Sequence, residues 1–105
     1  MRWRHCHAPI ADGHPHPVVT LNLIGDGVHN FIDGLIIGVS YLVSIPLGVA
    51  TTLAVIFHEI PQEFGDFGVL VNGGLSVKKA LFFNFLSALA SVLGGITALT
   101  VGTRI

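Results

Sequence analysis

The hydrophobic and polar positions divide the 105-residue chain into a short polar stretch and three long apolar segments. The apolar segments cover residues 18–43, 46–71 and 77–102, and about 20 apolar residues are enough to cross a bilayer as an α-helix. Pro46 suits the first turn of the second helix, and Asn72-Gly73-Gly74 is a strong stop signal after it. The pattern therefore predicts an all-α fold of three transmembrane helices, a transmembrane domain over residues 18–105.

Residues 1–17 do not share this pattern, because they are polar and rich in histidine and proline. Prolines at this density prevent a regular helix, so we expect a loop or tail. The histidines of this stretch are His5, His7, His14 and His16. Accessory metal capture by these histidines and a loop that is merely rich in histidine are equally good interpretations.

Composition agrees with a membrane protein and limits its partners. Only 10% of the residues are charged and the mean hydropathy is +0.77, whereas about 25% of a typical soluble domain is charged. The net charge of −1 gives no basic surface for nucleic acid. Because three helices line a polar pathway poorly, we expect the chain to be a fragment whose remaining helices complete the protein.

The few basic residues predict an orientation in the membrane. Arg2 and Arg4 precede the first apolar segment, and Lys78 and Lys79 follow the second, whereas the turn between these two segments is uncharged. Cytoplasmic loops carry an excess of Lys and Arg. Residues 1–17 and the 72–77 loop are therefore expected in the cytoplasm, in a multi-pass plasma or inner membrane protein.

The acids are concentrated where charge is most costly. Between residues 18 and 74 there is no Lys or Arg, and the acids in this region are Asp26, Asp33, Glu59, Glu63 and Asp66. Carboxylates in a bilayer pair with a basic group, take up protons or bind cations. A bound cation is thus the natural counter-charge, unless the acids are protonated or other parts of the protein supply a partner.

These acids belong to two clusters of polar residues near the middle of their segments. Asp26, His29, Asn30 and Asp33 are spaced i, i+3, i+4, i+7 and fall within an arc of about 100° on one helix. His58, Glu59, Gln62, Glu63 and Asp66 span about 140° on the next helix by the same count. Because a short turn joins the two helices, the clusters are predicted to face each other.

The side-chain types in the two clusters indicate a metal site and exclude three other kinds of metal centre. Imidazole with carboxylate and amide oxygens suits Zn²⁺, Fe²⁺, Mn²⁺ or Cd²⁺, and the single Cys6 excludes a thiolate centre. His58-Glu59 followed by Gln62 lacks the second histidine of a zinc protease, so we do not expect an enzyme. A soluble di-iron bundle would need charged outer faces, which these helices lack.

The two stretches His29-Asn30-Phe31-Ile32-Asp33-Gly34 and His58-Glu59-Ile60-Pro61-Gln62-Glu63-Phe64-Gly65-Asp66 resemble the ZIP (zinc/iron-regulated transporter-like) metal permeases. The likeness is closest to the subgroup with the pattern His-Glu-x-Pro-His-Glu-x-Gly-Asp. It implies a fragment covering the fourth to sixth membrane helices of a helical bundle with a metal site halfway across the bilayer.

The resemblance also implies roles for individual residues. The implied metal ligands are His29, Asn30, Asp33, His58, Glu59, Gln62 and Glu63, with Asp26 and Asp66 as accessory candidates. Gln62 stands where the subgroup has histidine, so one metal position should bind more weakly or select differently. The segment at 77–102 has no acid, which places a second metal position in doubt.

The expected function is transport of divalent metal, with Zn²⁺ carried into the cytoplasm as the substrate. The expected partners are the lipid bilayer, the metal ions, the remaining helices of the transporter and a second copy in a homodimer. Two alternatives stay open: a membrane sensor or storage subunit that binds metal without conducting it, and a proton-coupled carrier of a non-metal substrate that uses the acids as a relay.

Overall fold

A computed structural model describes residues 17–105 and consists of three helices. They are α1 (Pro17–Val43), α2 (Ile45–Asn72) and α3 (Val77–Gly102), and the described residues contain no strand. The predicted all-α class with three long helices is confirmed. The histidines of the first 16 residues, for which metal capture was considered, lie outside the described residues.

The turn between α1 and α2 is as short as the sequence indicates. Ser44 is extended, and its hydroxyl accepts a hydrogen bond from the Leu47 N–H at 3.1 Å. A serine in this position satisfies one of the N–H groups that the first turn of a helix leaves unpaired. Pro46 lies in that first turn, where its missing N–H costs nothing. Ser44 and Pro46 therefore allow α2 to begin immediately after α1 ends.

The connection between α2 and α3 is closed by glycine and serine. The Gly73 N–H donates to the Val69 carbonyl at 2.8 Å and ends α2. Gly74 has a φ of 113°, a conformation that side chains with a Cβ rarely adopt. Ser76 then accepts from the Lys79 N–H at 3.2 Å and starts α3. Asn72-Gly73-Gly74 thus ends α2 because Gly74 adopts a backbone conformation that glycine permits.

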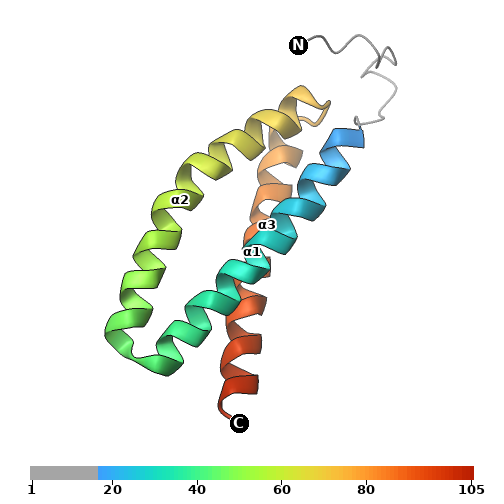
Figure 1. The fold of residues 1–105 in the computed structure, drawn as a ribbon. Helices are drawn as coiled ribbons and strands as arrows, with labels where there is room; N and C mark the ends of the chain where they lie inside the picture. The colour runs from blue at the N-terminus through green and yellow to red at the C-terminus, as the bar shows by residue number, and fades with distance from the viewer. Residues whose placement is uncertain (1–16) are drawn as a thin grey trace.

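The three helices form a hairpin with a third helix against its first arm (Figure 1). α1 and α2 run antiparallel, and α3 passes along α1 in the same direction as α1. A Cβ on Gly34 would overlap the Ser91 carbonyl oxygen, and one on Gly94 would overlap that of Phe31. Glycine on both helices therefore lets the backbones of α1 and α3 meet, as small residues do in membrane bundles.

Not every glycine of α1 has this role. Gly25 and Gly27 flank the polar cluster, where small residues can let a neighbouring helix approach as it does at Gly34. The structure places no atom within 4 Å of a Cβ built on Gly25 or Gly27. Within the described residues these two glycines therefore lie on faces of α1 without a close neighbour, although Asp26 between them contacts both α2 and α3.

The small apolar core lies at one end of the molecule. Val19, Leu70 and Ala80 are buried together where α1 begins, α2 ends and α3 begins. The partly buried residues around them are Leu23, Phe67, Val71, Leu75 and Phe83. This cluster fixes the three helix ends relative to one another and leaves the polar clusters further along the helices.

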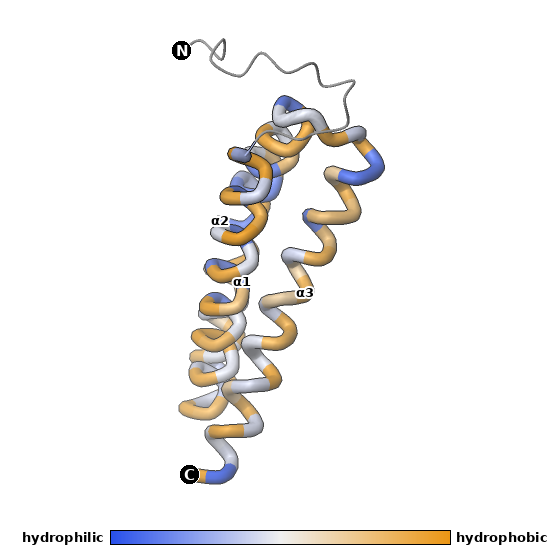
Figure 2. Tube along the Cα trace, turned by 90° about the vertical axis from the view of Figure 1, so that its right-hand side faces the viewer, coloured by the Kyte–Doolittle hydropathy of each residue, from blue (hydrophilic) through white to orange (hydrophobic). Residues whose placement is uncertain are grey.

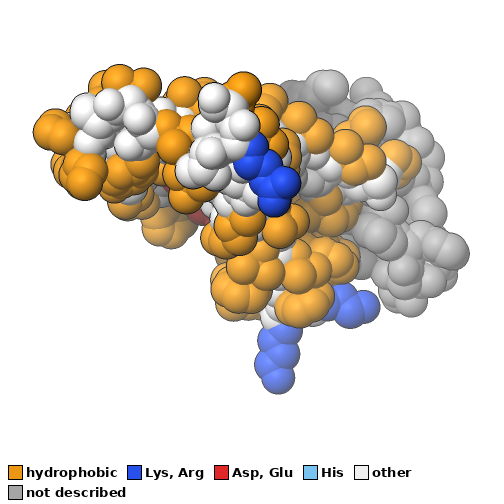
Figure 3. Space-filling model, turned by 90° about the horizontal axis from the view of Figure 1, so that it is seen from below, with side chains coloured by type: hydrophobic (Ala, Val, Ile, Leu, Met, Phe, Trp, Pro, Cys, Tyr) orange, Lys and Arg blue, Asp and Glu red, His pale blue; other side chains and the backbone are white. Residues whose placement is uncertain are grey.

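The distribution of side chains is the reverse of that in a soluble domain. Large apolar residues cover the outside (Figure 3). The buried polar residues are Asp26, Asn30, Asp33, Ser40, Asn84 and Ser87. Exposed apolar surface on this scale marks contact with lipid or with other protein. The described part of the chain thus keeps its polar groups inside and its apolar groups outside.

Hydropathy along the helices separates α3 from the other two. In the described part of the chain, α3 is the helix that is long and apolar enough to cross a membrane by length and composition. α1 and α2 carry hydrophilic positions within their length (Figure 2), and these are the polar clusters identified in the sequence.

Candidate metal site

The two polar clusters meet where α1 and α2 face each other. Nε2 of His29 lies 3.4 Å from Nε2 of His58. The Asp33 carboxylate completes a triangle, since its Oδ2 lies 3.0 Å from Nε2 of His29 and 3.3 Å from Nε2 of His58. The predicted apposition of His29 and Asp33 with His58 is therefore present in the structure.

The size of this triangle is that of one face of a metal coordination sphere. Two ligands at about 2.0–2.1 Å from a tetrahedral zinc ion lie about 3.3–3.4 Å apart. The three separations of 3.0, 3.3 and 3.4 Å are close to this value. Three donor atoms that converge in this way can hold a cation with little rearrangement.

Glu59 supplies a fourth donor beside the triangle. Its Oε1 lies 4.0 Å from Nε2 of His58, and the donor atoms of all four residues lie within 4.8 Å of one another. The side chain of Asp33 is 8% exposed, whereas those of both histidines are 45% exposed. The site is thus anchored on a buried carboxylate and open on the histidine side, so an ion can enter and leave.

A second group of acids lies among α1 and α2. Asp26, Glu63 and Asp66 offer carboxylate oxygens within 4.8 Å of one another. The amide of Asn22 donates to Oδ1 of Asp66 at 3.3 Å. No Lys or Arg occurs in the sequence of α1 or α2. This group, unlike the first, offers oxygen ligands alone.

The two amides that were predicted as ligands lie beside these groups and have defined partners. The Asn30 side chain is fully buried, and its Nδ2 donates to the Ser87 carbonyl at 3.1 Å. Gln62 donates from Nε2 to Oδ1 of Asp26 at 3.2 Å. Both amides therefore bond through nitrogen within this chain, and their oxygens are the atoms that could contact a metal.

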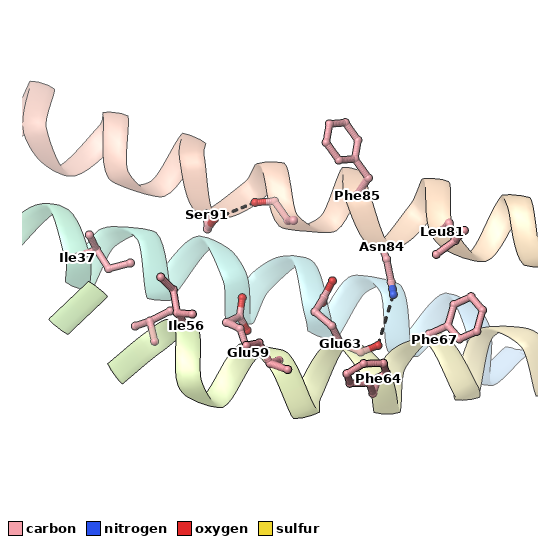
Figure 4. A pocket seen from close by; sticks show the side chains of 13 residues that line it. Ile37, Ile56, Glu59, Glu63, Phe64, Phe67, Leu81, Asn84, Phe85 and Ser91 are labelled. Carbon is pink, nitrogen blue, oxygen red and sulfur yellow. Dashed lines mark hydrogen bonds between the residues drawn. The ribbon is translucent and has the colours of Figure 1, made fainter. Parts of the chain in front are cut away.

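α3 contributes polar groups to the site. The Ser87 hydroxyl donates to Oδ2 of Asp26 at 2.6 Å. Asn84 donates to the Glu63 carbonyl at 3.4 Å and lines a groove of about 760 Å³ that Glu59 and Glu63 also line. Figure 4 shows both glutamates extending from α2 into the space between the helices. Asn84 therefore reaches the same space as the two glutamates.

Two residues of these contacts were not identified from the sequence. Asn22 continues the polar face of α1, because it lies one turn before Asp26; this spacing was a usable signal. Ser87 lies on α3, and nothing in the sequence of that segment indicates a bond to Asp26. That contact depends on how closely α3 approaches α1.

Buried oxygen atoms without donors surround both groups. Among the described residues, side-chain oxygens with no hydrogen-bond partner occur in Asn22, Asn30, Glu59, Glu63, Asp66 and Asn84. A buried acceptor without a donor costs free energy. A cation bound between the helices would satisfy several of these oxygens at once.

Comparison with known proteins identifies metal transporters as relatives of this chain. The family described as ZIP zinc transporter matches residues 6–104. The metal cation symporter ZIP14 of Xenopus tropicalis is 55% identical over 71 residues, 68% of this chain and 15% of that protein. The human zinc transporter ZIP10 is 36% identical over 112 residues, 96% of this chain and 14% of that protein.

A plant relative extends the range of similar proteins. IAA-alanine resistance protein 1 of Arabidopsis thaliana is 51% identical over 85 residues, 80% of this chain and 18% of that protein. The chain thus spans less than a fifth of the length of these relatives. No solved structure matches it. Because the family match covers nearly all of its residues, the chain belongs to the ZIP zinc transporter family.

Proposed function

We propose that the complete protein transports divalent metal cations across a membrane, with Zn²⁺ as the main substrate, and that this chain supplies its metal-binding centre. The observation that carries the proposal is the triangle of His29, Asp33 and His58, whose dimensions fit a single tetrahedral ion. The relatives named metal cation symporter and zinc transporter support it.

The absence of basic residues strengthens the argument for a cation. α1 and α2 together contain five acids and no Lys or Arg. Ionised carboxylates inside a membrane need a counter-charge, and a passing divalent ion supplies two positive charges. Mixed nitrogen and oxygen ligation also suits an ion that must be released, because it lacks the tightly binding thiolates of structural zinc sites.

The ligand set is proposed as two neighbouring parts. His29, Asp33, His58 and Glu59 form the first, with the oxygens of Asn30 and Gln62 beside them. Glu63, with Asp66 as an accessory oxygen, forms the second. Asp26 lies in the same group, but both of its oxygens already accept hydrogen bonds, from Ser87 and Gln62. Fe²⁺, Mn²⁺ and Cd²⁺ are further substrates of this donor set, since imidazole and carboxylate accept all of them.

Alanine substitution of the histidines tests the proposal. In the complete protein expressed in cells, His29→Ala and His58→Ala should each lower uptake of labelled zinc by more than about tenfold, the smallest loss usual when even an outer partner of a metal ligand is removed. Val28→Ala is the control, because its exposed side chain is adjacent to His29 in sequence and is not a ligand.

Surface labelling must show equal amounts of all variants in the membrane. Zinc accumulation by both histidine variants at the level of Val28→Ala would contradict the proposal. Liposomes that contain the purified protein separate transport from sensing or storage, because a protein that only binds zinc does not fill the vesicle with it.

A further inference from the structure

A chain of hydrogen bonds crosses all three helices beside the first metal group. It runs from Asn30 to Ser87, from Ser87 to Asp26, and from Gln62 to Asp26. The distances are 3.3 Å from Asn30 Nδ2 to Ser87 Oγ, 2.6 Å from Ser87 Oγ to Asp26 Oδ2, and 3.2 Å from Gln62 Nε2 to Asp26 Oδ1. Asp26 is 5% exposed and lies at the centre.

The chemistry of the partners fixes the direction of each bond. Asn30 also contacts the Ser87 backbone carbonyl at 3.1 Å, and a carbonyl can only accept, so the NH₂ of Asn30 must face α3. The single proton of the Ser87 hydroxyl goes to Asp26, which leaves the Ser87 oxygen free to accept from Asn30. The other oxygen of Asp26 accepts from the NH₂ of Gln62.

Both amides are consequently oriented with nitrogen toward the network and oxygen away from it. Oδ1 of Asn30 is buried without a hydrogen-bond partner among the described residues. The bond to Asp26 likewise occupies the nitrogen of Gln62 and leaves its Oε1 available as a donor to a cation. The Ser87 backbone carbonyl holds the Asn30 amide in this orientation. Without the bond to Asp26, however, the Gln62 amide could turn and present N–H, which repels a cation.

We infer that Asp26, which accepts from the Ser87 hydroxyl, is a positioning residue that orients the amide of Gln62 so that its oxygen faces the transported cation. Ser87 supports this role by holding the other oxygen of Asp26. The inference rests on the proposed function, since it concerns ligands of the same site. Outer partners of this kind commonly change metal affinity by about 10–100-fold.

Amide oxygen matters more to some ions than to others, which gives the test its specificity. Carbonyl and carboxylate oxygens suit Mn²⁺, whereas imidazole suits Zn²⁺. Turning an amide away should therefore weaken Mn²⁺ binding more than Zn²⁺ binding. A residue that only supports the fold would weaken both ions equally.

The experiment measures Zn²⁺ and Mn²⁺ binding to the purified complete protein by calorimetry. Ser87→Ala should lower Mn²⁺ affinity about tenfold and Zn²⁺ affinity less, and Ser87→Thr should restore both. Thr97→Val is the matched control, because it also removes a hydroxyl from α3, one that donates only to Leu93 of its own helix. In a Gln62→Met background, which lacks the amide, Ser87→Ala should not change the ratio of Zn²⁺ to Mn²⁺ affinity further.

Asp26→Asn is a second variant for the same network, because Ser87 and Gln62 donate to different oxygens of Asp26 and asparagine replaces one of these oxygens with an NH₂ group, which cannot accept. It should shift the ratio of Zn²⁺ to Mn²⁺ affinity in the same direction as Ser87→Ala. Equal losses for both ions, or affinities like those of Thr97→Val in both variants, would overturn the inference and leave the proposed function intact. A wild-type protein that binds neither ion overturns both.

Discussion

Gln62 is the residue at which this chain differs most clearly from the pattern it resembles, in which histidine occupies that position. In the structure it donates to Asp26 at 3.2 Å, a bond that needs an N–H on residue 62. Gln62 therefore pairs with the buried carboxylate of Asp26 on α1, and the effect of replacing Gln62 can be predicted.

Replacement of Gln62 by glutamate should make the protein more dependent on metal. Two carboxylates would then face each other about 3 Å apart with no proton donor between them, and an unsatisfied buried acceptor costs about 1–3 kcal/mol. A cation between them removes this cost and gains an anionic ligand. We expect Gln62→Glu to unfold at lower temperature than wild type without metal and to gain more thermal stability from added Zn²⁺.

Gln62→Met is the control for this change, because it keeps the length of the side chain and adds no charge. It should lose the bond to Asp26 and gain no more stability from Zn²⁺ than wild type does. Thermal unfolding curves with and without Zn²⁺ that shift equally in the glutamate variant and in wild type would contradict the prediction.

Much of the candidate site could be predicted from residue spacing alone. The i, i+3, i+4, i+7 spacing places Asp26, His29, Asn30 and Asp33 on one face of α1, and the short turn at Ser44 sets His58 opposite them. The structure places His29 and His58 in the predicted facing arrangement, with their Nε2 atoms 3.4 Å apart. The roles of Asn30 and Gln62 did not follow from spacing, because the rotation of an amide depends on partners from other helices.

At the scale of the helices, close packing of α1 against α3 determines which groups can meet. The approach is closest where Gly34 faces the backbone of Ser91, and one turn earlier on α3 Ser87 reaches Asp26. A side chain at Gly34 would separate the helices and break this bond as well. The glycine contact therefore holds the polar network in place.

Gly34→Ala should destabilise the bundle, because the added Cβ would overlap a backbone carbonyl that cannot move aside as a side chain can. Overpacking of this kind costs about 1–3 kcal/mol. Gly27→Ala is the matched control on the same helix, since nothing in the described chain lies within 4 Å of its Cβ. Reversible unfolding in detergent measures both.

The result that would contradict this prediction is equal stability of the two glycine variants. Ser87, Ser91 and Gly95 repeat a small residue every four positions on α3, a spacing typical of a helix-packing face. The partner helix could not be predicted from this repeat, because spacing within one helix does not specify which neighbour covers that face. The close contact belongs to α1, which is not adjacent to α3 in sequence.

At the scale of the whole molecule, the described helices bury polar side chains and expose apolar ones. Such a surface needs an apolar environment around it. The apolar faces must contact lipid or the other helices of the complete protein. The direction of the helices across the membrane decides which end of the metal site opens first to the cytoplasm. The basic residues predict that direction.

Lys78 and Lys79 lie at the start of α3, on the same side as the end of α2, whereas the turn at Ser44 is uncharged. The positive-inside rule therefore puts the α2–α3 connection in the cytoplasm and the α1–α2 turn outside. Val43 and Val77 mark these two ends, and both are well exposed, at 69% and 56%. Each can be replaced by cysteine in a complete protein otherwise free of cysteine.

A maleimide that does not cross membranes should label Val43→Cys in intact cells and label Val77→Cys only after the cells are permeabilised. Equal zinc uptake by the two variants would show that neither substitution disturbs the fold. The reverse labelling pattern would place the α2–α3 connection outside, and the metal would then pass the His29–His58 pair and the Asp26–Asp66 group in the opposite order. The labelling thus assigns the oxygen-only group to the entry or the exit side of the pathway.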